Sequence, residues 1–165
     1  MKKLIIVFVS LFFITAIIAQ NDSIQPPYKR FPFFPPVKLL LPDSVSYFTK
    51  ADLKKKSPAL LMLFNPQCEH CQHETEELIK NIDKFENIQV VMVTSMLFDS
   101  MMTFRQKYKL AQYKNIVVAR DANFFLFSFY LNHSLPLLAF YDKKKELIKI
   151  FEGSMKMEDV IEVFK

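Results

Sequence analysis

The chain has 165 residues, 51% of them hydrophobic, which is enough for one globular domain with a buried core. Lysine and arginine together number 22 and aspartate and glutamate number 17, so the formal net charge is +5. The basic residues lie in short runs, such as 54–56 and 143–145, which are typical of solvated turns and not of a nucleic-acid interface. The single glycine, Gly153, excludes the glycine-rich loops that bind phosphates.

The first nineteen residues have the pattern of an export signal. A short basic start precedes residues 4–19, which are apolar except for Ser10 and Thr15. These sixteen residues span about 24 Å as a helix, less than the hydrocarbon core of a bilayer, about 30 Å. Ala19 suits a cleavage site, because a polar stretch follows it. We expect a signal peptide at residues 1–19 and a periplasmic or otherwise exported protein without stable membrane insertion after cleavage. A retained membrane anchor is the alternative.

The chain has two cysteines, Cys68 and Cys71. A disulfide scaffold in a small secreted domain uses more cysteines, spread along the chain. A bridge over two intervening residues closes a very small loop and therefore constrains the unfolded chain little. The spacing thus indicates redox or metal chemistry and not a stabilising crosslink.

Residues 20–50 differ in composition from the rest of the chain. Six of the nine prolines lie in residues 21–42, which favours an extended arm. We expect the phenylalanines of this arm, Phe31, Phe33 and Phe34, to pack on the domain. Apolar runs at residues 37–41 and 45–48, separated by turn residues, predict a hairpin at the end of the arm.

The remainder of the chain alternates between strand-like and helix-like segments. Apolar runs bounded by turn residues predict strands at 59–64, 88–93, 115–119, 137–141 and 146–152. Helical spacing of apolar residues predicts helices at 68–85, 100–108, 121–131 and 158–164. This order predicts an α/β domain over residues 51–165, with a central mixed β-sheet between two layers of helices.

Two of these helices carry more specific expectations. Asp99 is expected to cap the helix at 100–108. The helix at 121–131 carries an aromatic run, which we expect to pack in the core: Phe124, Phe125, Phe127, Phe129 and Tyr130.

The sequence Cys68-Glu69-His70-Cys71 lies where the predicted strand at 59–64 passes into a helix. The N-terminus of a helix presents unpaired N–H groups and a partial positive charge, which favour a thiolate over a thiol. Cys71, three residues later, lies on the same face of the helix. We therefore expect Cys68 to attack a substrate disulfide and Cys71 to resolve the mixed disulfide.

The strand, the Cys-x-x-Cys at a helix start and a later proline before a strand, Pro136, together resemble the thioredoxin superfamily, and in particular its TlpA-like or redoxin branch. The resemblance implies a thioredoxin-like fold and a thiol–disulfide oxidoreductase without a cofactor. It further implies that Pro136 is a cis-proline facing the cysteines and that the backbone at Leu135 binds substrate peptide. Residues 99–131 resemble an insertion found in TlpA-like and peroxiredoxin-related branches.

The motif departs from that of thioredoxins. Gln67 stands in place of the tryptophan before the first cysteine and is expected to affect substrate binding, and Glu69-His70 replaces Gly-Pro. Met62 stands in place of a buried aspartate that relays protons. Glu74 matches a glutamate near the active site of TlpA-like cytochrome-maturation reductases. It is expected either to replace that aspartate or to be a solvated surface carboxylate.

The two residues between the cysteines are expected to tune the redox potential in opposite directions. A protonated His70 would stabilise a Cys68 thiolate, as in DsbA-like proteins, whereas Glu69 adds negative charge. The TlpA-like resemblance favours a reductase of protein disulfides that draws electrons from an unidentified donor. A disulfide oxidase or isomerase is the alternative direction.

Three other functions are considered. Zinc or copper could be bound by Cys68, Cys71 and the nearby histidines His70, His73 and His133, although structural zinc usually takes its ligands from two separated pairs. A peroxidase of the peroxiredoxin type is not expected, because its threonine position is occupied by Asn65. A binding module that keeps the fold without catalysis is disfavoured by the intact cysteine pair.

Overall fold

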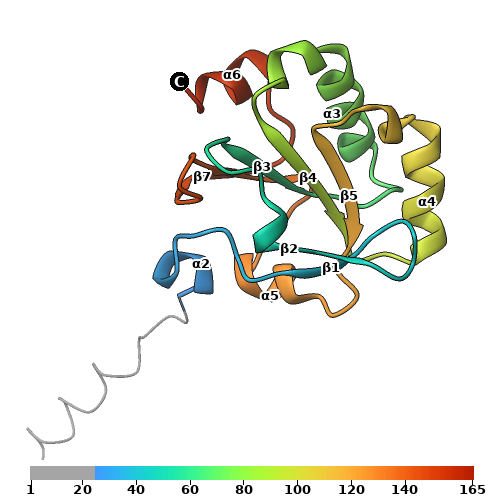
Figure 1. The fold of residues 1–165 in the computed structure, drawn as a ribbon, viewed down its shortest axis with the longest axis horizontal. Helices are drawn as coiled ribbons and strands as arrows, with labels where there is room; N and C mark the ends of the chain where they lie inside the picture. The colour runs from blue at the N-terminus through green and yellow to red at the C-terminus, as the bar shows by residue number, and fades with distance from the viewer. Residues whose placement is uncertain (1–24) are drawn as a thin grey trace, which may run out of the picture.

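The computed structural model describes residues 25–165, so the expected signal peptide lies outside the described residues. Figure 1 shows one central β-sheet with helices on both of its faces. The predicted three-layer α/β architecture with a mixed sheet is confirmed. Among the helices of residues 25–165, none has the length and apolar character needed to cross a bilayer.

The strands and helices lie close to their predicted positions. The strands are β1 (Lys38–Leu40), β2 (Tyr47–Thr49), β3 (Ala59–Leu63), β4 (Gln89–Thr94), β5 (Ile116–Arg120), β6 (Leu137–Tyr141) and β7 (Leu147–Glu152). The helices are α2 (Pro27–Arg30), α3 (Glu69–Lys80), α4 (Phe98–Lys107), α5 (Phe125–Tyr130) and α6 (Met157–Glu162). Short 3₁₀ turns occupy Lys50–Asp52, Ile82–Phe85 and Leu110–Gln112.

The seven strands are ordered β2-β1-β5-β4-β3-β6-β7 across the sheet. Strands β3, β4 and β5 run parallel, β6 pairs antiparallel with β3, and β7 pairs antiparallel with β6. The predicted hairpin of the N-terminal segment is formed by β1 and β2, and β1 pairs with β5 at Leu40 and Arg120. The hairpin therefore extends the same sheet.

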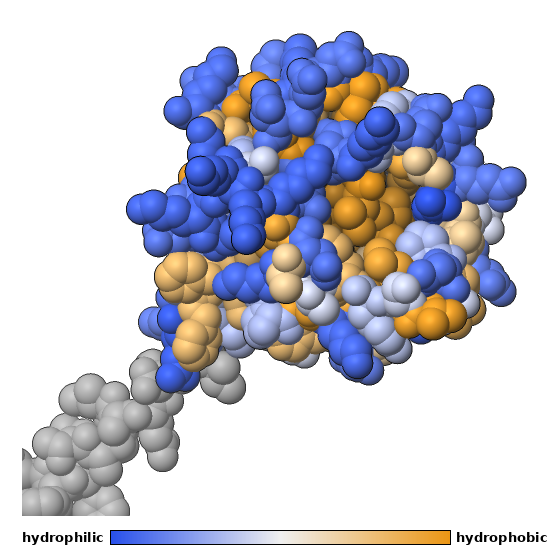
Figure 2. Space-filling model, viewed as in Figure 1, coloured by the Kyte–Doolittle hydropathy of each residue, from blue (hydrophilic) through white to orange (hydrophobic). Residues whose placement is uncertain are grey.

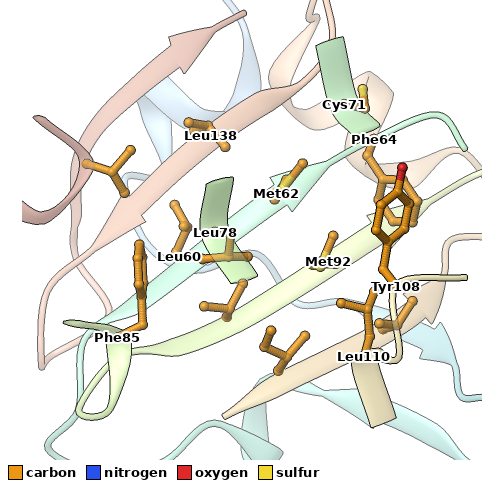
Figure 3. Packing of buried hydrophobic residues seen from close by; sticks show 14 of the residues in the cluster. Leu60, Met62, Phe64, Cys71, Leu78, Phe85, Met92, Tyr108, Leu110 and Leu138 are labelled. Atoms are coloured by element: carbon orange, nitrogen blue, oxygen red, sulfur yellow. The ribbon is translucent and has the colours of Figure 1, made fainter. Parts of the chain in front are cut away.

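Strand β3 is buried along its whole length because both faces of the sheet are covered. Leu60 and Met62 point to one face, where they pack with residues of α3, α4 and α6 (Figure 3). Leu61 and Leu63 point to the other face, toward α5 and the N-terminal segment. The carboxyl end of this doubly covered strand is the rigid base on which the cysteine motif is placed.

The expected packing of the N-terminal phenylalanines is only partly right. Phe34 is buried, with its ring centroid 5.0 Å from that of Tyr141. Phe31 and Phe33 are 61% and 46% exposed instead, and cationic side chains lie over their rings. Figure 2 shows exposed apolar residues beside the start of the described chain. The extended chain alternates its side chains, so neighbouring phenylalanines cannot all face the core.

Two helix predictions are wrong in detail. Asp99 is not the N-cap of α4, which is Leu97; Asp99 lies in the first turn. Helix α5 begins at Phe125 and not at Asp121, because the Asp121 carboxylate accepts hydrogen bonds from the backbone N–H groups of Asn123 and Leu126 and holds a turn there.

The short α5 also explains why the aromatic run is not wholly in the core. A helix of six residues buries one stripe, here Leu126, Phe129 and Tyr130. Phe124, Phe125 and Phe127 are exposed, contrary to expectation.

Candidate active site

The cysteine motif lies directly after the buried strand β3. Cys68 is the N-cap residue of α3, and its backbone N–H donates to the carbonyl oxygen of Asn65 at 3.0 Å. The Asn65 side chain accepts a hydrogen bond from the N–H of Gln67 at 2.9 Å, which closes the turn between strand and helix. Cys68 therefore stands at the start of α3, and the N-terminus of a helix favours a negative charge.

The two cysteines differ sharply in exposure. Cys68 is partly exposed, whereas Cys71 is fully buried, and neither forms a disulfide in this structure. Burial raises the pKa of the Cys71 thiol to about 12, and the neighbouring Cys68 thiol and Glu74 carboxyl add to the rise. An external disulfide can therefore reach the Cys68 thiol, whereas the Cys71 thiol is buried and neutral.

A loop that is distant in sequence completes the surface around Cys68. The Cys68 sulfur lies 3.8 Å from the carbonyl oxygen of Leu135, and the Leu135–Pro136 peptide bond is cis. Glu152 on β7 fixes this loop, because its Oε2 accepts hydrogen bonds from the N–H groups of His133 at 3.0 Å and Ser134 at 2.8 Å. The backbone beside the dithiol is thus held at a fixed position.

Glu74 lies on α3 behind the cysteines and is 2% exposed, so the solvated alternative is wrong. Its Oε2 accepts the N–H of Met155 at 3.1 Å, whereas its Oε1 is buried without a hydrogen-bond partner among the described residues. Burial raises the pKa of Glu74 from 4.5 to about 7, although the Met155 N–H opposes the rise. This carboxyl can therefore exchange a proton near neutral pH beside the buried thiol.

The other candidate residues of the motif face solvent. Gln67, Glu69 and His70 are exposed at the start of α3, and the His70 carbonyl accepts a hydrogen bond from the Ser154 hydroxyl at 3.4 Å. His73 and His133 are exposed as well. Within residues 25–165, no group of three or more His, Cys, Asp or Glu side chains is arranged to hold a metal ion. The geometry thus gives the metal alternative no support.

Comparison of the structure with solved structures identifies the fold. A secreted Mycobacterium tuberculosis disulfide oxidoreductase, homologous to E. coli DsbE, aligns with a TM-score of 0.65 and 19% identity over 78% of this chain and 93% of that chain. The exposed lipoprotein thioredoxin Etrx1 of Streptococcus pneumoniae aligns at 0.58 and 23% identity, covering 76% and 97%. StoA of Bacillus subtilis aligns at 0.56 and 18% identity, covering 78% and 98%.

The fold is thioredoxin-like. The sequence matches no protein-family model and no curated protein sequence. At these identities the structural likenesses establish the architecture, whereas the chemistry depends on the residues of this chain.

The thioredoxin-like frame brings the predicted residues together from two segments. The cysteines and Glu74 come from α3, and Leu135 and Pro136 come from the loop before β6. Sequence reasoning missed Asn65 and Glu152. The role of Asn65 could have been predicted, because an asparagine side chain in a turn commonly accepts the backbone N–H two residues later, here that of Gln67. The role of Glu152 could not have been predicted, because its two partners lie eighteen and nineteen residues away.

Proposed function

We propose that this protein is an exported thiol–disulfide oxidoreductase that reduces disulfides of other proteins through Cys68 and Cys71. The observation that carries the proposal is the asymmetry of the pair: a reachable thiol at a helix N-terminus next to a fully buried one. A structural pair has no need of that difference, whereas a two-step exchange does.

The exchange follows from this placement. The Cys68 thiolate attacks one sulfur of a substrate disulfide, a bond forms between the two sulfurs, and the other substrate sulfur leaves as a thiolate that takes up a proton. Cys71 then attacks the Cys68 sulfur and releases the second substrate thiol. The protein dithiol becomes a disulfide, and two electrons pass to the substrate. The carbonyl oxygen of Leu135, beside Cys68, is placed to accept an N–H of the substrate backbone.

Glu74 supports the second half of this exchange. Cys71 must lose its proton before it attacks, yet burial holds its pKa near 12. A carboxylate with a pKa of about 7 in the same buried region is a suitable acceptor for that proton near neutral pH. The unpaired Oε1 is free to take it.

Export and the direction of electron flow are the finer parts of the proposal. Export is supported by the sequence pattern of residues 1–19 and by the likeness to a secreted and to an exposed protein. The reducing direction is supported by the glutamate match to TlpA-like reductases. The proposal then requires an electron donor that keeps Cys68 and Cys71 reduced.

The test is capture of a covalent intermediate with a disulfide-bonded protein, insulin. Cys71→Ser should form a mixed disulfide between Cys68 and an insulin chain, visible on a non-reducing gel and by intact mass. Cys68→Ser, the matched control, should form none, and the unmodified protein should accelerate insulin reduction by dithiothreitol. A Cys71→Ala variant repeats the capture if the serine is poorly accommodated. An unmodified protein without effect on insulin, together with no adduct in either Cys71 variant, would overturn the proposal.

A further inference from the structure

A small hollow lies beside the cysteine motif and is separate from the dithiol itself. It has a volume of about 140 Å³ and lies between the ends of β3 and β4 and helix α5. No charged side chain lines it. Leu135, whose carbonyl oxygen is 3.8 Å from the Cys68 sulfur, lines its edge, so the hollow borders the position at which a substrate disulfide reacts.

The wall formed by α5 is apolar and open to solvent. Phe124 and Phe127 line the hollow and are 55% and 54% exposed, although both were expected to pack in the core. Large aromatic side chains at a concave surface are commonly covered when a ligand binds. The rings of these two phenylalanines are available to contact a ligand in the hollow.

Three polar side chains interrupt this apolar lining: Asn65, Ser95 and Asn132. Asn132 also lines the hollow and is 7% exposed. Its Nδ2 donates to the carbonyl oxygen of Ser134 at 3.4 Å, whereas its Oδ1 is buried without a hydrogen-bond partner among the described residues. The amide of Asn65 in the same lining is different, because its oxygen already accepts the N–H of Gln67. A buried acceptor without a partner is costly, so a ligand group that donates to it would be favoured.

Size and chemistry together restrict the ligand. An apolar cavity of about 150 Å³ accepts a benzene ring, so this hollow is suited to one six-membered aromatic ring. The acceptor oxygen of Asn132 favours a ring that carries a hydrogen-bond donor. Among protein side chains, tyrosine has both properties.

We propose that the hollow selects protein substrates with a tyrosine next to the reacting cysteine, whose ring lies against Phe124 and Phe127 and whose hydroxyl donates to Asn132. This selectivity rests on the proposed exchange at Cys68. It adds a preference that the dithiol alone does not have, because the cysteines and the Leu135 backbone contact the substrate without regard to its side chains.

The test uses short peptides as symmetric disulfide-linked dimers, Ser-Cys-X-Ser and Ser-X-Cys-Ser, with tyrosine, phenylalanine or alanine at X. Pre-reduced protein converts each dimer to two peptide thiols in a single turnover, and its own dithiol becomes the disulfide. Each rate is divided by the rate for the same peptide with dithiothreitol, which removes differences in intrinsic reactivity. In one of the two orders, phenylalanine should exceed alanine about tenfold, and tyrosine should exceed phenylalanine about fivefold.

Variants assign each preference to its residue through the ratio of rates within one protein. Phe127→Ala should reduce the preference of both rings over alanine. Phe125→Ala is the matched control, because Phe125 is an exposed phenylalanine of the same helix that does not line this hollow, and it should keep the preferences. Asn132→Ala should remove the preference for tyrosine over phenylalanine, and Asn132→Asp, which retains an acceptor, should keep it.

The outcomes separate this inference from the proposed function. Equal rates for the three peptides in both orders, with insulin still reduced, would overturn the tyrosine preference and leave the exchange chemistry standing. A preference for phenylalanine over tyrosine would overturn the role of Asn132. If neither the peptides nor insulin are reduced, the proposed function fails and the preference fails with it. The relative rates for the three peptides with the unmodified protein test the tyrosine preference even if an Asn132 variant does not fold.

Discussion

The side-chain sulfur of Cys68 lies 3.8 Å from the backbone carbonyl oxygen of Leu135, which is 67 residues further along the chain. The contact joins the start of α3 to the loop before β6, two segments that both adjoin the central strand β3. It places a backbone carbonyl oxygen, which accepts a hydrogen bond from the Cys68 thiol, at the reachable cysteine. The proposed exchange and the proposed preference for tyrosine both depend on this junction.

The first prediction concerns the stability of the fold with pH. The folded-state pKa of Glu74 is about 7, above 4.5, because burial disfavours its carboxylate. Below pH 4.5 the carboxyl is protonated in both the folded and the unfolded state, so it adds nothing to the pH dependence of the free energy of unfolding. As the pH rises toward 7, the unfolded chain ionises first, so the free energy of unfolding falls, by about 3 kcal/mol in all. Glu74→Gln should remove this fall in urea denaturation across pH 4.5 to 7.5.

The matched control is Glu86→Gln, which replaces an exposed carboxyl. It should follow the pH dependence of the unmodified protein. Identical pH dependence in the Glu74→Gln variant would contradict a buried carboxyl with a raised pKa. The same variant should also slow the attack of Cys71 on a mixed disulfide near neutral pH, by about 100-fold if Glu74 is the proton acceptor.

The second prediction concerns the loop that carries Leu135. Glu152→Ala leaves the N–H groups of His133 and Ser134 without their acceptor. We expect a loss of about 1 to 3 kcal/mol in the free energy of unfolding and a slower reduction of insulin, because the loop is less firmly held. Glu162→Ala removes an exposed carboxylate paired with Lys165 and should change both much less. Equal effects of the two variants would show that Glu152 does not hold the loop.

The third prediction concerns the N-terminal segment. Phe34→Ala should lower the free energy of unfolding by about 3 to 5 kcal/mol, because its buried ring packs on Tyr141. Phe31→Ala should change it by no more than about 0.5 kcal/mol, because that ring is exposed. Chemical denaturation of the two variants measures the difference. Equal stabilities would mean that the segment before β1 does not belong to the folded core.

The fourth prediction concerns the two exposed residues between the cysteines. A positive charge at His70 favours the reduced thiolate, so His70→Ala should make the reduction potential more negative. Glu69→Gln should make it less negative, because a nearby negative charge is removed. Both residues are exposed, so each effect should be about 10 to 20 mV. Potentials that move in the same direction in both variants would contradict a charge effect.

The sequence was sufficient for the frame of the fold and for the position of the motif. The continuous apolar run of β3 and the Cys-x-x-Cys after it are local patterns in the sequence. The structure has a buried strand and a helix start at the positions that these patterns predict. The burial of Glu74 was not predictable, because it depends on the segment around Met155, which covers α3 from 81 residues away. The hollow near Asn132 depends likewise on α5 being short, which the Asp121 carboxylate causes through a turn that periodicity does not reveal.

The exposure of some phenylalanines was likewise not predictable from the local sequence pattern. An aromatic run usually indicates core, and for Phe129 and Tyr130 it does. For Phe124 and Phe127 the local helix is too short to turn them inward, so they remain on a concave surface beside the motif. The failure of the core prediction at these two positions therefore marks the surface that we assign to substrate selection.

The reduction potential of the Cys68–Cys71 pair, measured by equilibrating the purified protein with glutathione and then dithiothreitol buffers, tests the central claim most directly. We predict one intramolecular disulfide, formed and broken in a two-electron step, with a potential near or below that of thioredoxin, about −270 mV. A potential near that of DsbA, about −120 mV, would contradict the reducing direction. Failure to form an intramolecular disulfide in any buffer would contradict the redox function itself.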